Sequence, residues 1–329
     1  MPAGPTVDGV LVQWGERLFY PPNRIVKPQP WPRLDTMVRR KAAVIRGRIA
    51  ATVRRAPQVM VKVTGGGRGM AAIAAHFRYI SRNGRLPIED DRGVVRDGKE
   101  SLKDLIDQWR YGGALIPEEG HRREAFNIML SMPHGTDARI VQCAAREFAK
   151  AELAGHRYVM VLHDHQANPH VHLSVRATGR DGSRLNPRKG DLHRWRETFA
   201  EKLRGYGIEA EASRQATRGE NRRFEALWRV KAKDEGRLLA TRPSVKSGDA
   251  YLTSRNEAFL AGRHIMEVLT QSDRPDDQAL AGDILRFARE SPYLRNIIQK
   301  REPTRPVRPA PEPQRSALQR TRPDIEIER

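Results

Sequence analysis

Cysteine is almost absent from this chain of 329 residues, which contains only Cys143. A single cysteine cannot form an intramolecular disulfide, so a disulfide-stabilised secreted domain is excluded. A zinc site built mainly from cysteine thiolates is excluded for the same reason. This cysteine usage suits a reducing compartment, and we expect a cytoplasmic protein.

Long hydrophobic runs are also missing. No apolar run approaches the roughly 18 residues that a membrane-spanning helix needs. The first residues, Met1 to Pro5, lack the basic flank and the apolar core of a signal peptide. The sequence therefore predicts neither membrane insertion nor a secretory signal.

Acidic residues are too few to balance the basic ones. The chain has 60 lysines and arginines against 40 acidic residues, which gives a net charge of +20 and a pI near 10.7. Such an excess indicates a polyanionic partner, most often nucleic acid. The alternative is a basic surface that only interacts with solvent, as on a ribosomal or aggregation-resistant protein.

Histidine is concentrated in one stretch, residues 163–172, which holds four of the ten histidines of the chain. Apolar residues lead into His163, Asn168-Pro169 favours a turn, and a second apolar run follows His172. The pattern predicts a β-hairpin that places His170 and His172 on one strand face, with a third imidazole on the neighbouring strand. Three convergent imidazoles can bind a metal ion, although strand histidines are often only surface residues.

The order of elements between residues 57 and 223 predicts an α+β fold. Apolar and β-branched runs predict five strands, and amphipathic stretches predict helices between them. We expect a central antiparallel or mixed five-stranded sheet flanked by helices, with residues 85–123 as a polar connector. The strands are expected at 58–63, 125–131, 157–163, 170–177 and 208–212.

The regions on either side of this core have a different composition. Residues 1–33 are proline-rich and read as irregular, whereas 35–55 read as a basic amphipathic helix that either binds nucleic acid or a membrane surface, or faces solvent. A mostly helical, charged region and a disordered tail rich in proline and arginine follow the core. We therefore expect four regions, at 1–56, 57–223, 224–300 and 301–329.

A predicted helix at residues 70–82 carries an unusual tyrosine. Its buried stripe is Ile73, Phe77 and Ile80, and Tyr79 lies about 120° away from the centre of that stripe at 100° per residue. Most tyrosines in such positions only contribute amphipathic packing. The basic residues Arg78, Arg82 and Arg85 surround Tyr79 in the sequence.

Three motifs occur in a fixed order and together resemble a known family. They are Tyr79-Ile80-Ser81-Arg82-Asn83-Gly84 after a glycine-rich loop, the run from Ile128 to Asp137, and the histidine hairpin. Together they resemble the plasmid-mobilisation relaxases, in the branch of the T-DNA border endonuclease. The resemblance extends over about residues 57–220. Relaxases of this branch belong to the histidine-hydrophobe-histidine (HUH) endonucleases, whose antiparallel sheet is flanked by helices.

The resemblance implies a role for each motif. Tyr79 is expected to attack a phosphodiester of single-stranded DNA at a nick site and to form a 5′-phosphotyrosine bond. His163, His170 and His172 are expected to bind a divalent ion, Mg²⁺ or Mn²⁺, and Ser131 is expected to hold DNA near the nick. The family often has aspartate where this chain has His165, so His165 is expected to assist proton transfer or to orient an imidazole.

Basic residues near these motifs are expected to contact the DNA, and accessory DNA-processing or coupling proteins are further expected partners. The expected DNA-binding residues are Arg68, Arg78, Arg82, Arg184, Arg188, Lys189, Arg214 and Arg218.

Two other functions remain open on the sequence. A metal-dependent phosphodiesterase would use the histidines and water but not Tyr79, and a noncatalytic DNA-binding protein would use the metal structurally. Rolling-circle replication initiators are related, but they usually place the tyrosine after the histidines.

Overall fold

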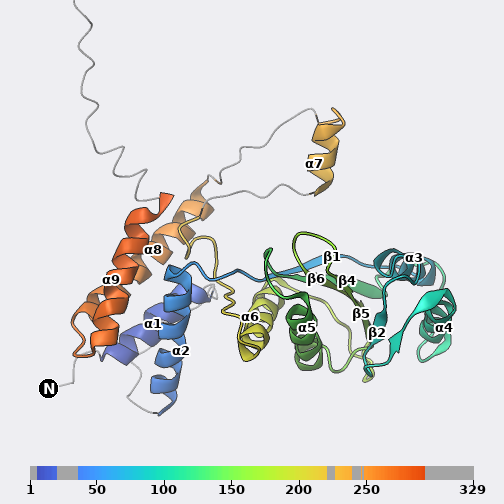
Figure 1. The fold of residues 1–329 in the computed structure, drawn as a ribbon, viewed down its shortest axis with the longest axis horizontal. Coiled ribbons are helices and arrows are strands. Elements are labelled where there is room, and N and C mark those ends of the chain that lie inside the picture. Colours follow the sequence, from blue (N-terminus) through green and yellow to red (C-terminus); the bar gives the residue numbers. More distant parts are fainter. Residues whose placement is uncertain (1–5, 21–35, 221–226, 239–245, 247, 293–329) are drawn as a thin grey trace, which may run out of the picture.

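The computed structural model describes residues 6–20, 36–220, 227–238, 246 and 248–292. A sheet with its covering helices forms one part of the molecule, and a group of helices from both ends of the described chain forms the other (Figure 1). The helices are α1 Val7–Phe19, α2 Thr36–Val53, α3 Met70–Ile80, α4 Gly98–Tyr111, α5 Ala138–Glu152, α6 Lys189–Gly205, α7 Leu227–Asp234, α8 Asp249–Thr270 and α9 Pro275–Glu290. The strands are β1 Met60–Gly65, β2 Ile88–Asp90, β3 Val95–Arg96, β4 Ala125–Ser131, β5 Tyr158–His163 and β6 His170–Arg176. The predicted tail at 301–329 lies outside the described residues.

The strands form one sheet in the order β1-β4-β6-β5-β2-β3, and every neighbouring pair is antiparallel. The predicted α+β fold with an antiparallel sheet flanked by helices is confirmed. The number of strands was wrong, because the sheet has six strands rather than five. The segment at 85–123, which was expected to be a connector, contains β2 and β3, and these strands are too short to show alternation of apolar and polar residues. The strand expected at 208–212 is not formed, and this segment contributes only a single parallel bridge between Gln58 and Glu211.

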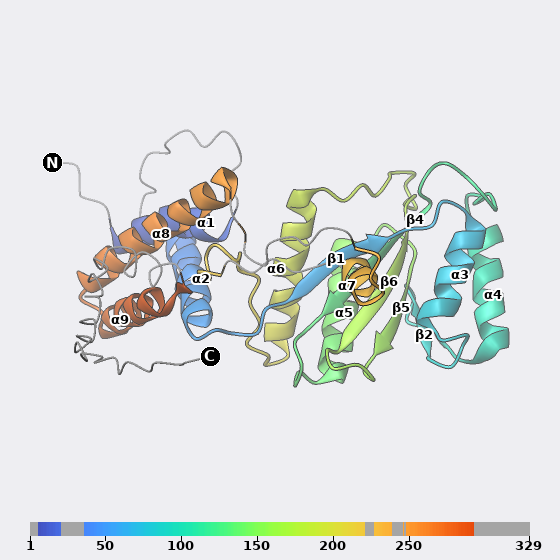
Figure 2. The same cartoon turned by 90° about the horizontal axis from the view of Figure 1, so that it is seen from above.

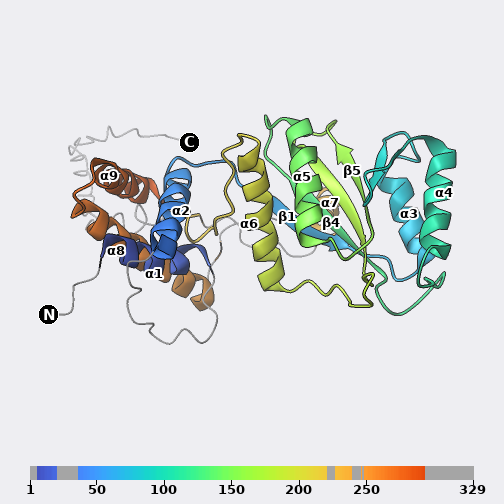
Figure 3. The same ribbon diagram turned by 90° about the horizontal axis from the view of Figure 1, so that it is seen from below.

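The two faces of the sheet are covered differently (Figures 2 and 3). Helices α5 and α6 cover one face, where Val171 and Leu173 of β6 pack with Phe148 and Phe199. On the opposite face, α3 and α4 pack over the β5 side through Val159 and its neighbours. Side chains on neighbouring antiparallel strands share a face when their residues are paired, so the hairpin histidines lie on this second face, next to α3.

Local capping defines the helices that border the second face. The predicted helix at 70–82 is confirmed as α3, and its stripe of Ile73, Phe77 and Ile80 is buried. Helix α4 begins at Gly98, where the carboxylate of Asp97 caps the first turn by accepting from the Gly98 amide.

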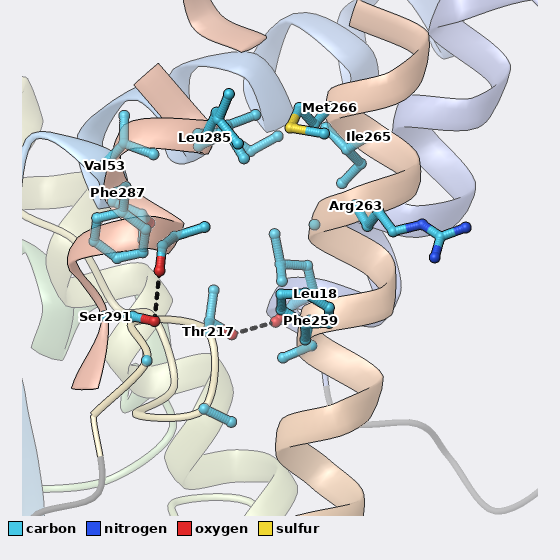
Figure 4. A pocket seen from close by; sticks show the side chains of 18 of the residues that line it. Leu18, Val53, Thr217, Phe259, Arg263, Ile265, Met266, Leu285, Phe287 and Ser291 are labelled. Carbon is cyan, nitrogen blue, oxygen red and sulfur yellow. Dashed lines mark hydrogen bonds between the residues drawn. The ribbon is translucent and has the colours of Figure 1, made fainter. Parts of the chain in front are cut away.

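Helices from the two flanking regions pack together. Residues 1–33 were expected to be irregular, yet 7–19 form α1, which packs with α2, α8 and α9 around a core that includes Leu11, Ile45 and Ile265 (Figure 1). The loop at residues 213–220 joins this bundle, where the Thr217 hydroxyl donates a 2.7 Å hydrogen bond to the Leu18 carbonyl beside an apolar pocket (Figure 4). We therefore propose a sheet domain accompanied by one composite helical unit.

The basic helix α2 uses part of its charge inside the protein. The Arg46 guanidinium donates to Asp277 of α9 at 2.7 and 3.1 Å and to Asp8 of α1 at 2.7 Å. Arg48 donates to Glu211 and Glu197, so it joins α2 to the sheet domain. These two arginines therefore stabilise packing, and they are not available to a DNA phosphate.

None of the helices in the described part of the chain combines the length and the apolar character of a membrane span.

Replacement of Arg46 tests the ion pairs that hold the bundle. In Arg46→Met the buried carboxylate of Asp277 loses its cation, and we expect the free energy of unfolding to fall by about 3 kcal/mol. Urea denaturation followed by tryptophan fluorescence measures the loss. Arg39→Ala, an exposed change on the same helix, is the control and should stay within about 0.5 kcal/mol of the wild type. Equal stability of the two variants would contradict a structural role for Arg46.

Candidate functional site

The β5–β6 hairpin brings three histidines together as the sequence predicted. His163 pairs with His170 across the hairpin, and His172 follows on the same face. One ring nitrogen from each of the three can be chosen so that all lie within 4.8 Å of one another. The ring centroids are 4.7 to 5.0 Å apart. This convergence of three imidazoles is suited to a single metal ion.

Hydrogen bonds to backbone carbonyls define which ring nitrogen of His163 and of His170 keeps a lone pair. The His163 Nε2 lies 2.7 Å from the Ile80 carbonyl, and the His170 Nδ1 lies 2.9 Å from the Asn168 carbonyl. A carbonyl can only accept, so each of these nitrogens carries the proton and leaves the other with a lone pair. The His163 Nδ1 and the His172 Nδ1 are buried without a hydrogen-bond partner in the described structure. A metal ion would satisfy such lone pairs, so the residues fit the ion that the family implies.

Burial favours the neutral form of two of the imidazoles, His172 and His163. It lowers the pKa of His172 to about 3, with a smaller contribution from the neighbouring His163, His170 and His76. Burial also lowers the pKa of His163, although the hydrogen bond to the Ile80 carbonyl acts in the opposite direction. A neutral imidazole is the form that binds metal, so little proton competition is expected at neutral pH.

Tyr79 lies at the end of α3, near the candidate metal ligands. Its side chain is 72% exposed, as the helical pattern predicted. The next residue, Ile80, provides the carbonyl that receives the His163 hydrogen bond. The helix that carries Tyr79 is therefore attached directly to one of the candidate metal ligands.

His76 connects Tyr79 with the histidine cluster and was given no role on the sequence alone. Its ring centroid lies 6.2 Å from that of Tyr79 and 6.4 Å from that of His172. Burial lowers its pKa to about 4, and its Nε2 is buried without a hydrogen-bond partner in the described structure. The sequence did indicate that His76 and Tyr79 are neighbours, because they are three residues apart and residues i and i+3 share a helix face.

Ser131 and His165 occupy different surroundings. Ser131 is buried at the end of β4, is paired with His170 in register, and its hydroxyl lies 3.3 Å from the Pro169 carbonyl. His165 is exposed in the hairpin turn, with its ring 5.1 Å from that of His163, and it is outside the group of three. Both roles stay predictions, and the geometry favours His163 over His165 as the third ligand.

The expected DNA-binding residues fall into two groups. In the described structure, Arg68, Arg78, Arg82, Arg188 and Lys189 are exposed and form no salt bridge. The guanidinium groups of the other three also bind protein atoms: Arg184 with Glu124 and Thr178, Arg214 with the carbonyls of Arg17 and Leu18, and Arg218 with Gln58 and Glu220. The DNA contacts of all eight residues stay predictions.

Removal of single histidines tests the metal centre. His170→Ala removes one of three converging ligands, and we expect the affinity for Mn²⁺ to fall by at least about 100-fold. His165→Ala is the matched control, because it removes a neighbouring imidazole outside the group, and its affinity should remain near that of the wild type. Calorimetric titration measures both. If His165→Ala loses the ion and His170→Ala keeps it, the ligand assignment is wrong.

Comparison with known families adds independent support. Residues 79–208 match the family model described as relaxase, MobA/VirD2-like, nuclease domain. The match begins at Tyr79 and includes Ser131 and the whole histidine hairpin. No curated protein matches the chain. The resemblance seen in the three motifs is confirmed, since residues 79–208 are similar to the nuclease domain of MobA/VirD2-like relaxases.

Proposed function

We propose that this protein is a site- and strand-specific DNA relaxase that nicks single-stranded DNA at the transfer origin of a plasmid or mobile element. The observation that carries the proposal is the position of Tyr79, exposed at the end of α3 and one residue from the carbonyl that binds His163. The Tyr79 ring neighbours that of His76, which in turn neighbours that of His172, and this supports a tyrosine nucleophile near the candidate metal centre. Conjugative mobilisation is the process that such a nick serves.

His163, His170 and His172 would hold a divalent ion. When bound, the ion would polarise the scissile phosphate and stabilise the charge that develops on its oxygens. Nitrogen donors suit Mn²⁺ better than Mg²⁺, which prefers an oxygen shell, so of the two expected ions we favour Mn²⁺. Three neutral ligands leave the full charge of the ion available to the phosphate.

Tyr79 supplies the nucleophile in this proposal. Its phenol oxygen forms a bond to phosphorus, the bond from phosphorus to the 3′ oxygen breaks, and the 3′ oxygen leaves as a hydroxyl after taking up a proton. A phenol needs a base or nearby positive charge to act in this way. We propose that His76, whose ring centroid lies 6.2 Å from that of Tyr79, accepts the phenol proton.

The covalent product conserves the energy of the phosphodiester. The 5′ phosphate remains attached to Tyr79, so the reverse reaction can rejoin the strand without ATP. The basic excess of the chain holds the single strand during this interval. Ser131, which contacts the carbonyl before His170, is proposed to help place the strand at the nick, and accessory DNA-processing or coupling proteins are proposed to deliver it.

Replacement of Tyr79 by phenylalanine tests this function. The change removes only a hydroxyl on an exposed side chain, so folding and metal binding should persist. Cleavage of an origin oligonucleotide should fall by at least about 1,000-fold, since loss of the nucleophile removes the covalent route. The assay follows both the cut strand and the protein–DNA adduct on a denaturing gel.

Tyr111→Phe is the matched control, because Tyr111 is also highly exposed, at 71%, but lies at the end of α4. It should cleave at the wild-type rate. Full cleavage by Tyr79→Phe with no adduct would instead favour a metal-dependent phosphodiesterase that uses water. DNA binding without cleavage by the wild-type protein would favour a noncatalytic role.

A further inference from the structure

A basic cleft lies between the end of α3 and the length of α4. Its volume is about 520 Å³, and the apolar side chains of Leu102 and Ile106 form part of its lining. Five cationic residues line it, together with Asn83 and the acidic Asp107. The cations are Arg78, Arg85, Lys99, Lys103 and Arg110.

The positive charge of this cleft is largely uncompensated. Arg110 forms ion pairs with Asp107 and Glu118, so the one acidic group in the lining is already used. The remaining four cations are exposed and form no ion pair with any described residue. Many arginines elsewhere in the described chain, such as Arg46 and Arg48, are paired with acids. Four unpaired cations around one concave surface favour binding of a polyanion.

The two walls of the cleft are fixed to each other by a tight turn. Arg82 and Asn83 have positive φ angles of 51° and 58°, and Gly84 follows with φ of 80°. The Ser81 hydroxyl closes this turn by accepting from the Gly84 amide at 3.1 Å, and the Gly98 amide donates to the Gly84 carbonyl at 3.0 Å. A Cβ atom on Gly84 would lie 2.7 Å from the Gly98 carbonyl oxygen, so only glycine allows this approach. The cations of α3 and α4 are therefore held facing one cleft.

Tyr79 lies between the metal-binding histidines and this cleft. At about 100° per residue, Tyr79 is about 60° around α3 from His76, and Arg78 is about 100° further in the same direction. His76 faces His172, and Arg78 lines the cleft. A strand whose scissile phosphate reaches Tyr79 therefore has the cleft immediately beyond the nucleophile.

We propose that the α3–α4 cleft binds the phosphodiester backbone of the single strand next to the scissile phosphate. This inference rests on the proposed relaxase function for its ligand, but it assigns a separate binding site with no part in bond cleavage. Lys99 and Lys103 stand one turn apart on α4, so both can contact the same strand, while Arg78 and Arg85 bind it from the opposite wall.

Binding of a (dT)20 oligonucleotide to Lys99→Ala/Lys103→Ala in the full chain tests the cleft. Tyr79→Phe is included in every protein, and metal is removed with a chelator, so cleavage cannot contribute. Loss of two phosphate contacts should make the log–log salt dependence of the affinity less steep by about 1.4, at about 0.7 per contact for single strands. Both lysines are exposed on a helix surface, where alanine is well tolerated.

Arg139→Ala/Arg289→Ala is the charge-matched control. These arginines are exposed on α5 and α9, away from the cleft, and neither forms an ion pair with a described residue. The control should keep the wild-type slope to within about 0.3, less than half the effect of one phosphate contact. Equal slopes in the two double variants would overturn the proposal. A flattened slope in the cleft variant alone supports it even if the wild-type protein never cleaves DNA, so failure of the cleft and failure of the relaxase function are distinguishable.

Discussion

The hydrogen bond between the His163 Nε2 and the Ile80 carbonyl is the contact on which the site depends. It assigns the His163 proton to Nε2, and so it leaves the Nδ1 lone pair able to bind a metal ion. It also attaches the last turn of α3, which carries Tyr79, to the edge of the histidine hairpin. One short contact therefore couples the position of the nucleophile to the tautomer of a metal ligand, and a shift of α3 would disturb both.

The basic residues have different surroundings in the helical bundle and near the end of α3. In the bundle and at its junction with the sheet, arginines such as Arg46 and Arg48 are paired with buried carboxylates, so these cations serve packing. Around the end of α3, Arg78, Arg85, Lys99 and Lys103 are exposed and form no ion pair with a described residue, so they remain available for phosphates. The basic residues of the chain therefore serve different purposes: some stabilise packing, and only the others can attract or bind DNA.

The sequence predicted what is encoded locally. Alternation on β5 and β6, the turn at Asn168-Pro169 and the stripe on α3 placed the three histidines and the exposed Tyr79 correctly. Contacts between distant residues could not be predicted from local patterns. Strands β2 and β3 are too short for a periodic signal, and α1 is stabilised by packing with α2 and with the distant α8. The same reason explains Arg214, whose partners are carbonyls nearly 200 positions away.

The central claim is that Tyr79 attacks the DNA, and mapping the covalent bond tests it most directly. The wild-type protein is trapped with an origin oligonucleotide, digested with protease and nuclease, and its peptides are sequenced by mass spectrometry. The account predicts a nucleotide linked through a 5′ phosphate to the tyrosine in Tyr79-Ile80-Ser81. A 5′ phosphate on Tyr111, Tyr158 or Tyr206 would contradict the assignment while leaving the covalent mechanism intact.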